Sequence, residues 1–148
     1  MNNYDLLESI EKAVSPGGVL LGKDVSDRPD SWPPTGGCKA MAIIRPTSTE
    51  EVSQVLRLCH AAGRGVVTHG GLTGLVGGAK AGRDELVLSL ERMNGIEKVD
   101  VVNRTVTVEA GGPLQRVHEV AEEAELLFPL DLGARGSCTI GGNISTNA

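Results

Sequence analysis

A glycine-rich tract at Gly70–Gly78 is the first stretch of this sequence that could bind a ligand. Its nine residues, GGLTGLVGG, include five glycines and follow, after His69, the segment 65–68, which we predict as a buried strand. Ordering such a flexible loop costs more backbone entropy than usual, so a compensating contact is expected. Consecutive unhindered amides can form a nest for an anion, and the hydroxyl of Thr73 adds a donor. The tract favours a phosphate-bearing ligand, and the alternative is a tight turn packed on a neighbouring strand.

A second glycine-rich tract, at residues 133–147, again places glycine beside short polar side chains. Two such tracts, far apart in the sequence, favour an extended ligand held at two places over a single phosphate. The patterns GxxxxGK[ST] and GxGxxG do not occur in the chain, which argues against a P-loop nucleotide hydrolase and against a Rossmann dinucleotide site.

The composition is that of a folded domain rather than a disordered chain, with 40% hydrophobic and 22% charged residues among 148. Fourteen Lys and Arg against 19 Asp and Glu give a net charge of −5, which argues against a nucleic-acid partner. The apolar runs are too short for a transmembrane helix, and the start of the chain lacks the basic residues of a secretory signal. Three widely spaced cysteines predict free thiols in a reducing cytoplasm, and their spacing from the histidines favours no metal site.

The segments that must position the two tracts begin with a βαβ unit. Residues 42–44 and 65–68 are predicted as strands, and a helix between them begins at a capping box. In that box Ser48 Oγ accepts from the amide of Glu51, and the Glu51 carboxylate accepts from the amide of Ser48. One apolar helical face follows, made of Val52, Val55, Leu56 and Cys59, and Gly63 is placed as a left-handed cap. The two strands should be parallel.

The later segments continue the alternation of strands and helices. Residues 86–90 are predicted as a buried strand, and 96–102 with 105–109 as a hairpin turning at Asn103–Arg104, with Val99, Val101, Val106 and Val108 inward. Pro113 is placed at the first position of a helix, whose apolar stripe consists of Leu114, Val117, Ala121 and Ala124.

The chain is divided at residue 35. Residues 1–35 are predicted as a lead-in, with an amphipathic stretch at 5–14 and turns with little regular structure at 24–34. Residues 36–148 are predicted as one domain, and the fold class is α/β (α+β).

Four motifs occur in order within residues 42–148: RPTSTEEV at 45–52, GGLTG at 70–74, LSLERMN at 88–94, and a stretch from PLDLGA at 129 to IGGNI at 140–144. They resemble the N-terminal part of the flavin-binding domain of the vanillyl-alcohol oxidase / p-cresol methylhydroxylase (PCMH-type) family. Their sequences are most similar to those of FAD-linked D-2-hydroxyacid dehydrogenases, which include D-lactate, D-2-hydroxyglutarate and glycolate-oxidase-subunit-like enzymes. The resemblance implies a PCMH-type domain: an N-terminal βαβ subdomain and the start of a second subdomain.

The resemblance also implies a set of cofactor-binding residues. The FAD pyrophosphate would be held by Gly70, Gly71, Leu72, Thr73, Gly74 and Leu75, with Gly71 and Gly74 expected to need positive φ or a close approach to phosphate. Lining the cofactor after the third strand would be Ser89, Met93 and Asn94. Along the ribityl chain and flavin ring would lie Pro129, Asp131, Gly136, Ser137, Cys138, Ile140, Gly141, Gly142, Asn143 and Thr146.

Some relatives attach the flavin covalently to a histidine just after the paired glycines. Leu72 occupies that position here, so the resemblance implies noncovalent FAD, and His69 is expected to be a loop residue rather than an attachment point. His118 is expected to be a partly exposed helix residue, and Asp131 a carboxylate that orders its loop. No residue of this sequence is assigned as a catalytic base.

The implied activity is oxidation of a D-2-hydroxyacid to the 2-oxoacid, with hydride passing to flavin N5 and electrons to an unidentified acceptor. In the family the flavin domain continues and a cap domain supplies the substrate site and the base. We therefore expect a C-terminal half, or a partner chain carrying it, and little activity from these 148 residues alone. The expected location is cytoplasmic, with peripheral membrane association as an alternative for the full enzyme. Two alternatives are a truncated noncatalytic FAD-binding module and a flavoenzyme similar to UDP-N-acetylenolpyruvoylglucosamine reductase.

Overall fold

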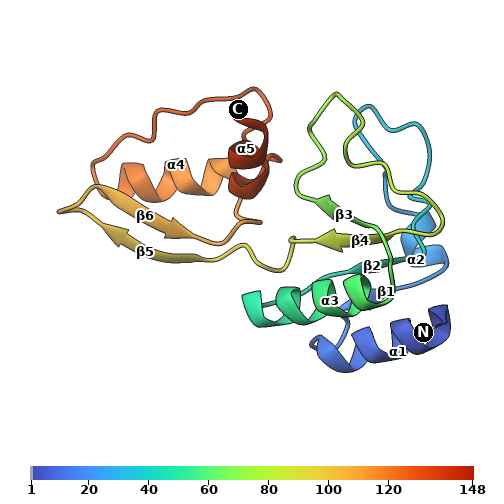
Figure 1. The fold of residues 1–148 in the computed structure, drawn as a ribbon. Helices are drawn as coiled ribbons and strands as arrows, with labels where there is room; N and C mark the ends of the chain where they lie inside the picture. The colour runs from blue at the N-terminus through green and yellow to red at the C-terminus, as the bar shows by residue number, and fades with distance from the viewer. Residues whose placement is uncertain (1) are drawn as a thin grey trace. The chain divides into compact units, whose positions relative to one another are not determined.

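The computed structural model describes residues 2–148, which divide into two compact units (Figure 1). The sheet unit comprises the chain up to His69 together with Gly74–Arg92, and the hairpin unit comprises Gly70–Thr73 and Met93–Ala148. Both units contain helices and strands, so the α/β fold class expected from the sequence is confirmed. Within the described residues, no helix is both long enough and apolar enough to cross a membrane.

The sheet unit is built on four strands, β1 (Val19–Leu20), β2 (Ala42–Ile44), β3 (Val66–His69) and β4 (Leu86–Ser89), in the order β1-β2-β4-β3. β4 lies between β2 and β3 and is parallel to both, while β1 is antiparallel to β2. The predicted parallel orientation of the first two strands of the βαβ unit is confirmed. All side chains of β2 and β4 are buried, because helices or loops cover both faces of this central pair.

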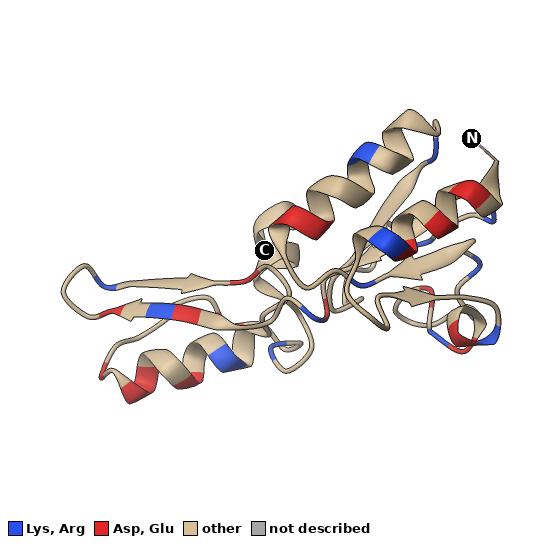
Figure 2. Ribbon diagram, turned by 90° about the horizontal axis from the view of Figure 1, so that it is seen from below, with Lys and Arg blue, Asp and Glu red and all other residues tan. Residues whose placement is uncertain are grey.

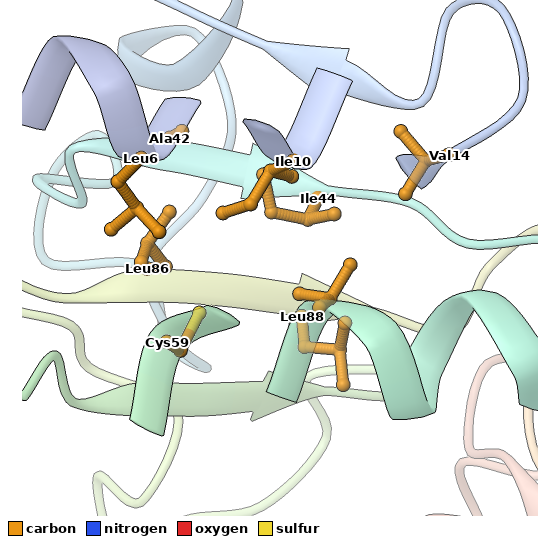
Figure 3. Close-up of a cluster of buried hydrophobic side chains, with 9 residues drawn as sticks. Leu6, Ile10, Val14, Ala42, Ile44, Cys59, Leu86 and Leu88 are labelled. Carbon is orange, nitrogen blue, oxygen red and sulfur yellow. The ribbon is translucent and has the colours of Figure 1, made fainter. Parts of the chain in front are cut away.

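Two helices, α1 (Asn3–Ala13) and α3 (Thr49–Ala61), cover one face of this sheet (Figure 1). Figure 3 shows their side chains meeting those of β2 and β4 in a core formed by Leu6, Ile10, Val14, Ala42, Ile44, Val55, Cys59, Leu86 and Leu88. The prediction that Leu56 faces the core is wrong, since it is exposed, and Leu58 packs against the cluster instead. Gly63 has a φ of +62°, as its predicted place at the helix end requires.

The opposite face of the sheet is covered by the segment that follows β1. A short helix, α2 (Lys23–Ser26), places Val25 against a second cluster that includes Cys38, Ala40, Ile43, Ala81 and Val87. The expectation of turns with little regular structure at 24–34 differs from the structure at its start, because burial of Val25 stabilises one turn of helix there. Residues 1–35 contribute side chains to both clusters, while the domain boundary at residue 36 stays a prediction.

The hairpin unit contains β5 (Ile96–Asp100) and β6 (Thr105–Val108), which pair antiparallel, and α4 (Leu114–Glu123), which packs against both strands. The hairpin is confirmed, but Val101 is exposed rather than inward because the strand ends at Asp100. Pro113 precedes α4 as its N-cap, and the buried stripe is Leu114, Val117 and Val120.

A fifth helix, α5 (Ile140–Thr146), occupies the second glycine-rich tract. No helix is among the elements expected from the sequence here; two adjacent glycines have low helix propensity. Figure 2 shows acidic and basic residues side by side on elements such as β5 and α4, in keeping with the modest net charge.

At the start of α3, one of the two hydrogen bonds of the predicted capping box is present and the other is replaced. Ser48 Oγ accepts from the amide of Glu51 at 3.2 Å, as expected. The Glu51 carboxylate, however, accepts from the amide of Thr47 at 2.8 Å and from the amide of Ser15 at 3.0 Å, rather than from Ser48. It thereby joins the turn after α1 to the start of α3. Burial alone would raise the pKa of Glu51, but these hydrogen bonds outweigh it and the pKa lies below its ordinary value.

Replacing Glu51 tests this link. Glu51→Gln is expected to lower the free energy of unfolding by about 1–2 kcal/mol, because hydrogen bonds to a charged acceptor are lost. Since the folded-state pKa is lowered, the carboxylate stabilises the protein at neutral pH, and this contribution is lost as the pH falls through that pKa. Urea unfolding at neutral and acidic pH measures the difference. Glu50→Gln, at an exposed neighbouring position, is the control and should change little; equal effects of the two variants would contradict the prediction.

Candidate functional site

The loop Gly70–Gly78 leaves the carboxyl end of β3, as the sequence predicts (Figure 1). Its amides are free of internal partners: between Gly70 and Ala79, none donates a hydrogen bond to another group of the described chain. Consecutive amides without internal acceptors can donate hydrogen bonds to an acceptor from outside the chain, such as a phosphate oxygen.

The start of this loop packs directly against the second tract. A Cβ on Gly71 would lie 1.8 Å from the carbonyl oxygen of Ser137, and a Cβ on Gly70 would lie 2.5 Å from Thr139 Oγ1. Neither position can carry a side chain without moving these neighbours, and at Gly71 the obstacle is backbone. The two glycine tracts are therefore in contact, and glycine is what permits it.

The expected positive φ at Gly71 and Gly74 is not observed. Neither residue is among those with positive φ, and a Cβ on Gly74 would meet nothing within 4 Å. Leu72 instead takes the left-handed conformation, with a φ of +54°. That conformation costs a residue with a side chain about 1 kcal/mol or more, and such strain is concentrated at ligand-binding and catalytic positions.

The second tract contains the start of helix α5. Thr139 is the N-cap of α5, and the amide of Leu114, at the start of α4, donates to the Cys138 carbonyl at 3.0 Å. A Cβ on Gly141 would lie 2.8 Å from the carbonyl oxygen of Ala110. The glycine thus lets α5 lie against the chain that leads from β6 into α4.

Two buried polar groups in this tract have no partner in the described chain. They are Thr139 Oγ1 and Asn143 Nδ2, on residues that are 9% and 6% exposed. Buried polar groups are almost always hydrogen-bonded, so these two suit hydrogen bonds to a bound ligand. Together with the unpaired amides of Gly70–Thr73 in the same unit, they fit the oxygens of a dinucleotide's phosphates, ribityl hydroxyls or ring carbonyls.

Thr139 was not among the residues expected to bind the cofactor. The signal was present in the sequence, because a threonine immediately before a Gly-containing helix is a typical N-cap. It was missed because the Ile-Gly-Gly segment was not predicted to be helical.

The remaining candidates are divided between the two units. In the sheet unit, Gly74 and Leu75 are exposed and Ser89 is buried at the end of β4. In the hairpin unit, Met93 is buried and its carbonyl accepts from the amide of Gly111 at 2.8 Å, while Asn94 is exposed.

The candidates of the second tract differ in exposure. Those exposed to solvent are Pro129, Asp131, Gly136, Ser137, Gly142 and Thr146; Cys138 and Asn143 are buried, and Ile140 and Gly141 are half-buried. Asp131 lies 3.4 Å from Arg135 in an exposed ion pair, as expected for a carboxylate that orders its own loop. The hydroxyl of Thr146 donates to the Gly142 carbonyl at 2.8 Å, so it is already engaged within α5.

An ion-pair network lies where β2 and β4 end. Glu91 accepts from Arg28 at 3.0 Å and from Arg45 at 3.1 Å. Burial opposes ionisation of Glu91, but the two guanidinium groups hold its pKa below the ordinary value. Three loops distant in sequence are thereby fixed around one carboxylate, at the edge of the sheet where open α/β folds bind ligands.

The histidines differ from one another in their surroundings. His60 is exposed on α3, and His118 is half-buried on α4 with its Nε2 2.7 Å from the Leu130 carbonyl, as expected for a helix residue. The expectation of a loop position for His69 is wrong. It is the last residue of β3, is 5% exposed, and has its Nε2 2.7 Å from the Ala79 carbonyl. Burial lowers the pKa of this imidazole.

Comparison with known proteins gives relatives for most of the chain. The D-2-hydroxyglutarate dehydrogenase of Xanthomonas citri pv. viticola is 50% identical over 127 residues, covering 86% of this chain and 25% of that protein. The mitochondrial D-2-hydroxyglutarate dehydrogenase of Danio rerio is 40% identical over 141 residues, covering 95% of this chain and 26% of that protein. The chain thus spans about a quarter of the length of these curated relatives.

Solved structures share the fold. An alkyldihydroxyacetonephosphate synthase matches with a TM-score of 0.86 and 18% identity, over 100% of this chain and 32% of that one. A p-cresol methylhydroxylase with bound substrate matches with a TM-score of 0.74 and 20% identity, over 97% of this chain and 28% of that one. The PCMH-type fold expected from the motifs is confirmed.

The family model described as "FAD binding domain" matches residues 40–148, which is most of the chain and includes both glycine tracts. The resemblance drawn from the four motifs is therefore confirmed: the chain belongs to the FAD-binding domain family.

Proposed function

We propose that this chain binds FAD noncovalently through its two glycine tracts. The observation that carries the proposal is the contact between Gly70–Gly71 and Ser137–Thr139, which places unpaired loop amides beside the unpartnered hydroxyl of Thr139. Family membership names the ligand that such donors would bind. Leu72, which stands where some relatives carry the attachment histidine, has no nucleophile, and this supports noncovalent binding.

Each group of candidate residues has a separate role in this proposal. Amides of Gly70–Leu75 and the Thr73 hydroxyl would donate to the pyrophosphate, because they have no competing acceptors within the chain. Thr139 and Asn143 would donate to ribityl or ring oxygens. The half-buried Ile140 and the buried Met93 would supply apolar surface, and Ser89 would contact the cofactor from the end of β4.

The complete protein is proposed to oxidise a D-2-hydroxyacid to the corresponding 2-oxoacid. Bound FAD would supply a hydride acceptor at N5, and an unidentified partner would reoxidise it. The names of the relatives support this substrate class and favour it over a cell-wall reductase. No described residue of this chain is assigned as the base for the substrate hydroxyl, so the base would come from elsewhere in the protein.

A second candidate is an FAD-binding module without catalysis of its own, because the family model that matches the chain describes FAD binding alone. Mixing the chain with the remaining part of a relative distinguishes the two: restored D-2-hydroxyacid oxidation supports a dehydrogenase component, and bound FAD without any turnover supports the module. We also propose a cytoplasmic location for the protein, on the basis of its three widely separated cysteines.

The flavin spectrum of the purified chain tests cofactor binding directly. After addition of FAD and dialysis, we expect visible flavin absorbance to remain with the protein. Denaturation should then release all of it into a protein-free filtrate, because no covalent bond is proposed. Loss of the absorbance on dialysis, with no binding in a direct titration, would contradict FAD binding by this chain.

Gly71→Ala tests the contact between the tracts. The added methyl would collide with the Ser137 carbonyl, so we expect FAD affinity to fall by about tenfold or more. Gly78→Ala is the matched control, because it lies in the same loop with open space and no positive φ. Calorimetric titration with FAD and a thermal unfolding scan of both variants measure affinity and folding. Wild-type affinity in a folded Gly71→Ala protein would refute the pyrophosphate assignment.

Thr139→Val tests whether the unpartnered hydroxyl serves the cofactor. Replacing a buried hydroxyl that lacks a partner by a methyl should leave the free protein equally stable or more stable, by up to about 1 kcal/mol. FAD affinity should fall by about 1–2 kcal/mol, because a hydrogen bond to the ligand is lost. Chemical unfolding and FAD titration measure the two effects. A loss of stability with unchanged affinity would show that Thr139 acts only within the fold.

A further inference from the structure

His69 is a buried polar residue that the proposed cofactor contacts do not use. It ends β3, and its backbone carbonyl accepts from the amide of Leu90 at 3.1 Å, so the sheet fixes its position. Its ring Nε2 lies 2.7 Å from the carbonyl oxygen of Ala79. A carbonyl can only accept, so Nε2 carries the proton and donates it.

This hydrogen bond joins the two ends of the glycine loop. His69 immediately precedes Gly70, and Ala79 immediately follows Gly78, so the bond joins the ends of the segment whose amides lack internal partners. At its far end, the amide of Lys80 donates to the Gly77 carbonyl at 3.1 Å in a turn. A glycine-rich segment held so loosely would sample many conformations without a fixed closing point.

The surroundings of His69 keep this donor neutral. Burial lowers its pKa, and the effects of the nearby charges oppose one another, since Arg28 lowers the pKa and Glu91 raises it. A neutral ring closes the loop without placing a cation inside the fold.

We propose that His69 is a positioning residue: its Nε2–H holds the glycine loop closed, in the arrangement that receives the phosphates of a dinucleotide. The proposal rests on the FAD binding proposed above. The bond contributes by fixing the loop before the ligand arrives, so less conformational entropy is lost on binding. His69 acts through the loop and makes no contact with the ligand itself.

Two substitutions separate the hydrogen bond from the volume of the ring. In His69→Gln the amide nitrogen can reach the position of Nε2 and donate to Ala79, whereas in His69→Leu the side chain fills space without a donor. We expect His69→Leu to speed hydrogen exchange of the amides at residues 70–80 in the absence of FAD, and to weaken FAD binding about tenfold. His69→Gln should restore both properties to near wild-type values. His60→Leu, on the exposed surface of α3, is the control and should change neither.

NMR of the imidazole nitrogens in the wild-type chain gives an independent measurement. The expected result is an Nε2-protonated, neutral ring at neutral pH with a slowly exchanging ring proton. A ring protonated only at Nδ1 would overturn the proposal, as would equal loss of loop protection and affinity in His69→Gln and His69→Leu. If wild-type protein does not bind FAD, the proposed function fails, while loop exchange without FAD still decides whether His69 closes the loop.

Discussion

The close approach of one backbone segment to another sets the geometry of this site. The carbonyl of Ser137 occupies the space where a side chain at Gly71 would begin, so the two tracts can meet only as main chain. Because they meet in this way, Gly70 lies against Thr139, whose hydroxyl stays buried without a partner. The amides of Gly70–Thr73, in the same unit as Thr139, likewise have no internal acceptor. Within the hairpin unit, polar groups without internal partners therefore lie where the two tracts meet, which suits a polar ligand.

The rest of the sheet unit acts as a rigid base for that loop. β2 and β4 are buried on both faces, and Glu91, after β4, pairs with Arg45, after β2, and with Arg28, between α2 and β2. The loop after β3 differs from the loops joined by these ion pairs, because its glycines have no side chains to form such contacts. Binding residues carried on loops at the carboxyl ends of parallel strands are typical of open α/β sheets. The strands therefore supply rigidity, and the loop supplies main-chain donors.

Local patterns predicted the elements well, and contacts between distant segments explain what they missed. The capping box located the start of α3, but the second hydrogen bond of Glu51 goes to Thr47 because the carboxylate also binds Ser15, 36 positions earlier. Glycine content identified both tracts in the sequence. Position 71 requires glycine, however, because a carbonyl of the other tract lies too close for a side chain, and not because of a positive φ. α5 was missed because propensity argues against Gly141 in a helix, whereas its packing on Ala110 demands glycine. The hydrogen-bond partner of His69 lies ten residues away and leaves no periodic signal.

The division of the chain between the units bears on how it folds. The polypeptide enters the hairpin unit at Gly70, leaves it after Thr73 and returns at Met93. The hairpin unit is therefore incomplete until Gly70–Thr73, which lie between two segments of the sheet unit in the sequence, pack with it. Contacts of such long sequence separation are entropically expensive to form early and slow the folding of a domain. A cut after Arg92 would not release an autonomous module, because the second piece would leave behind the four residues that complete it.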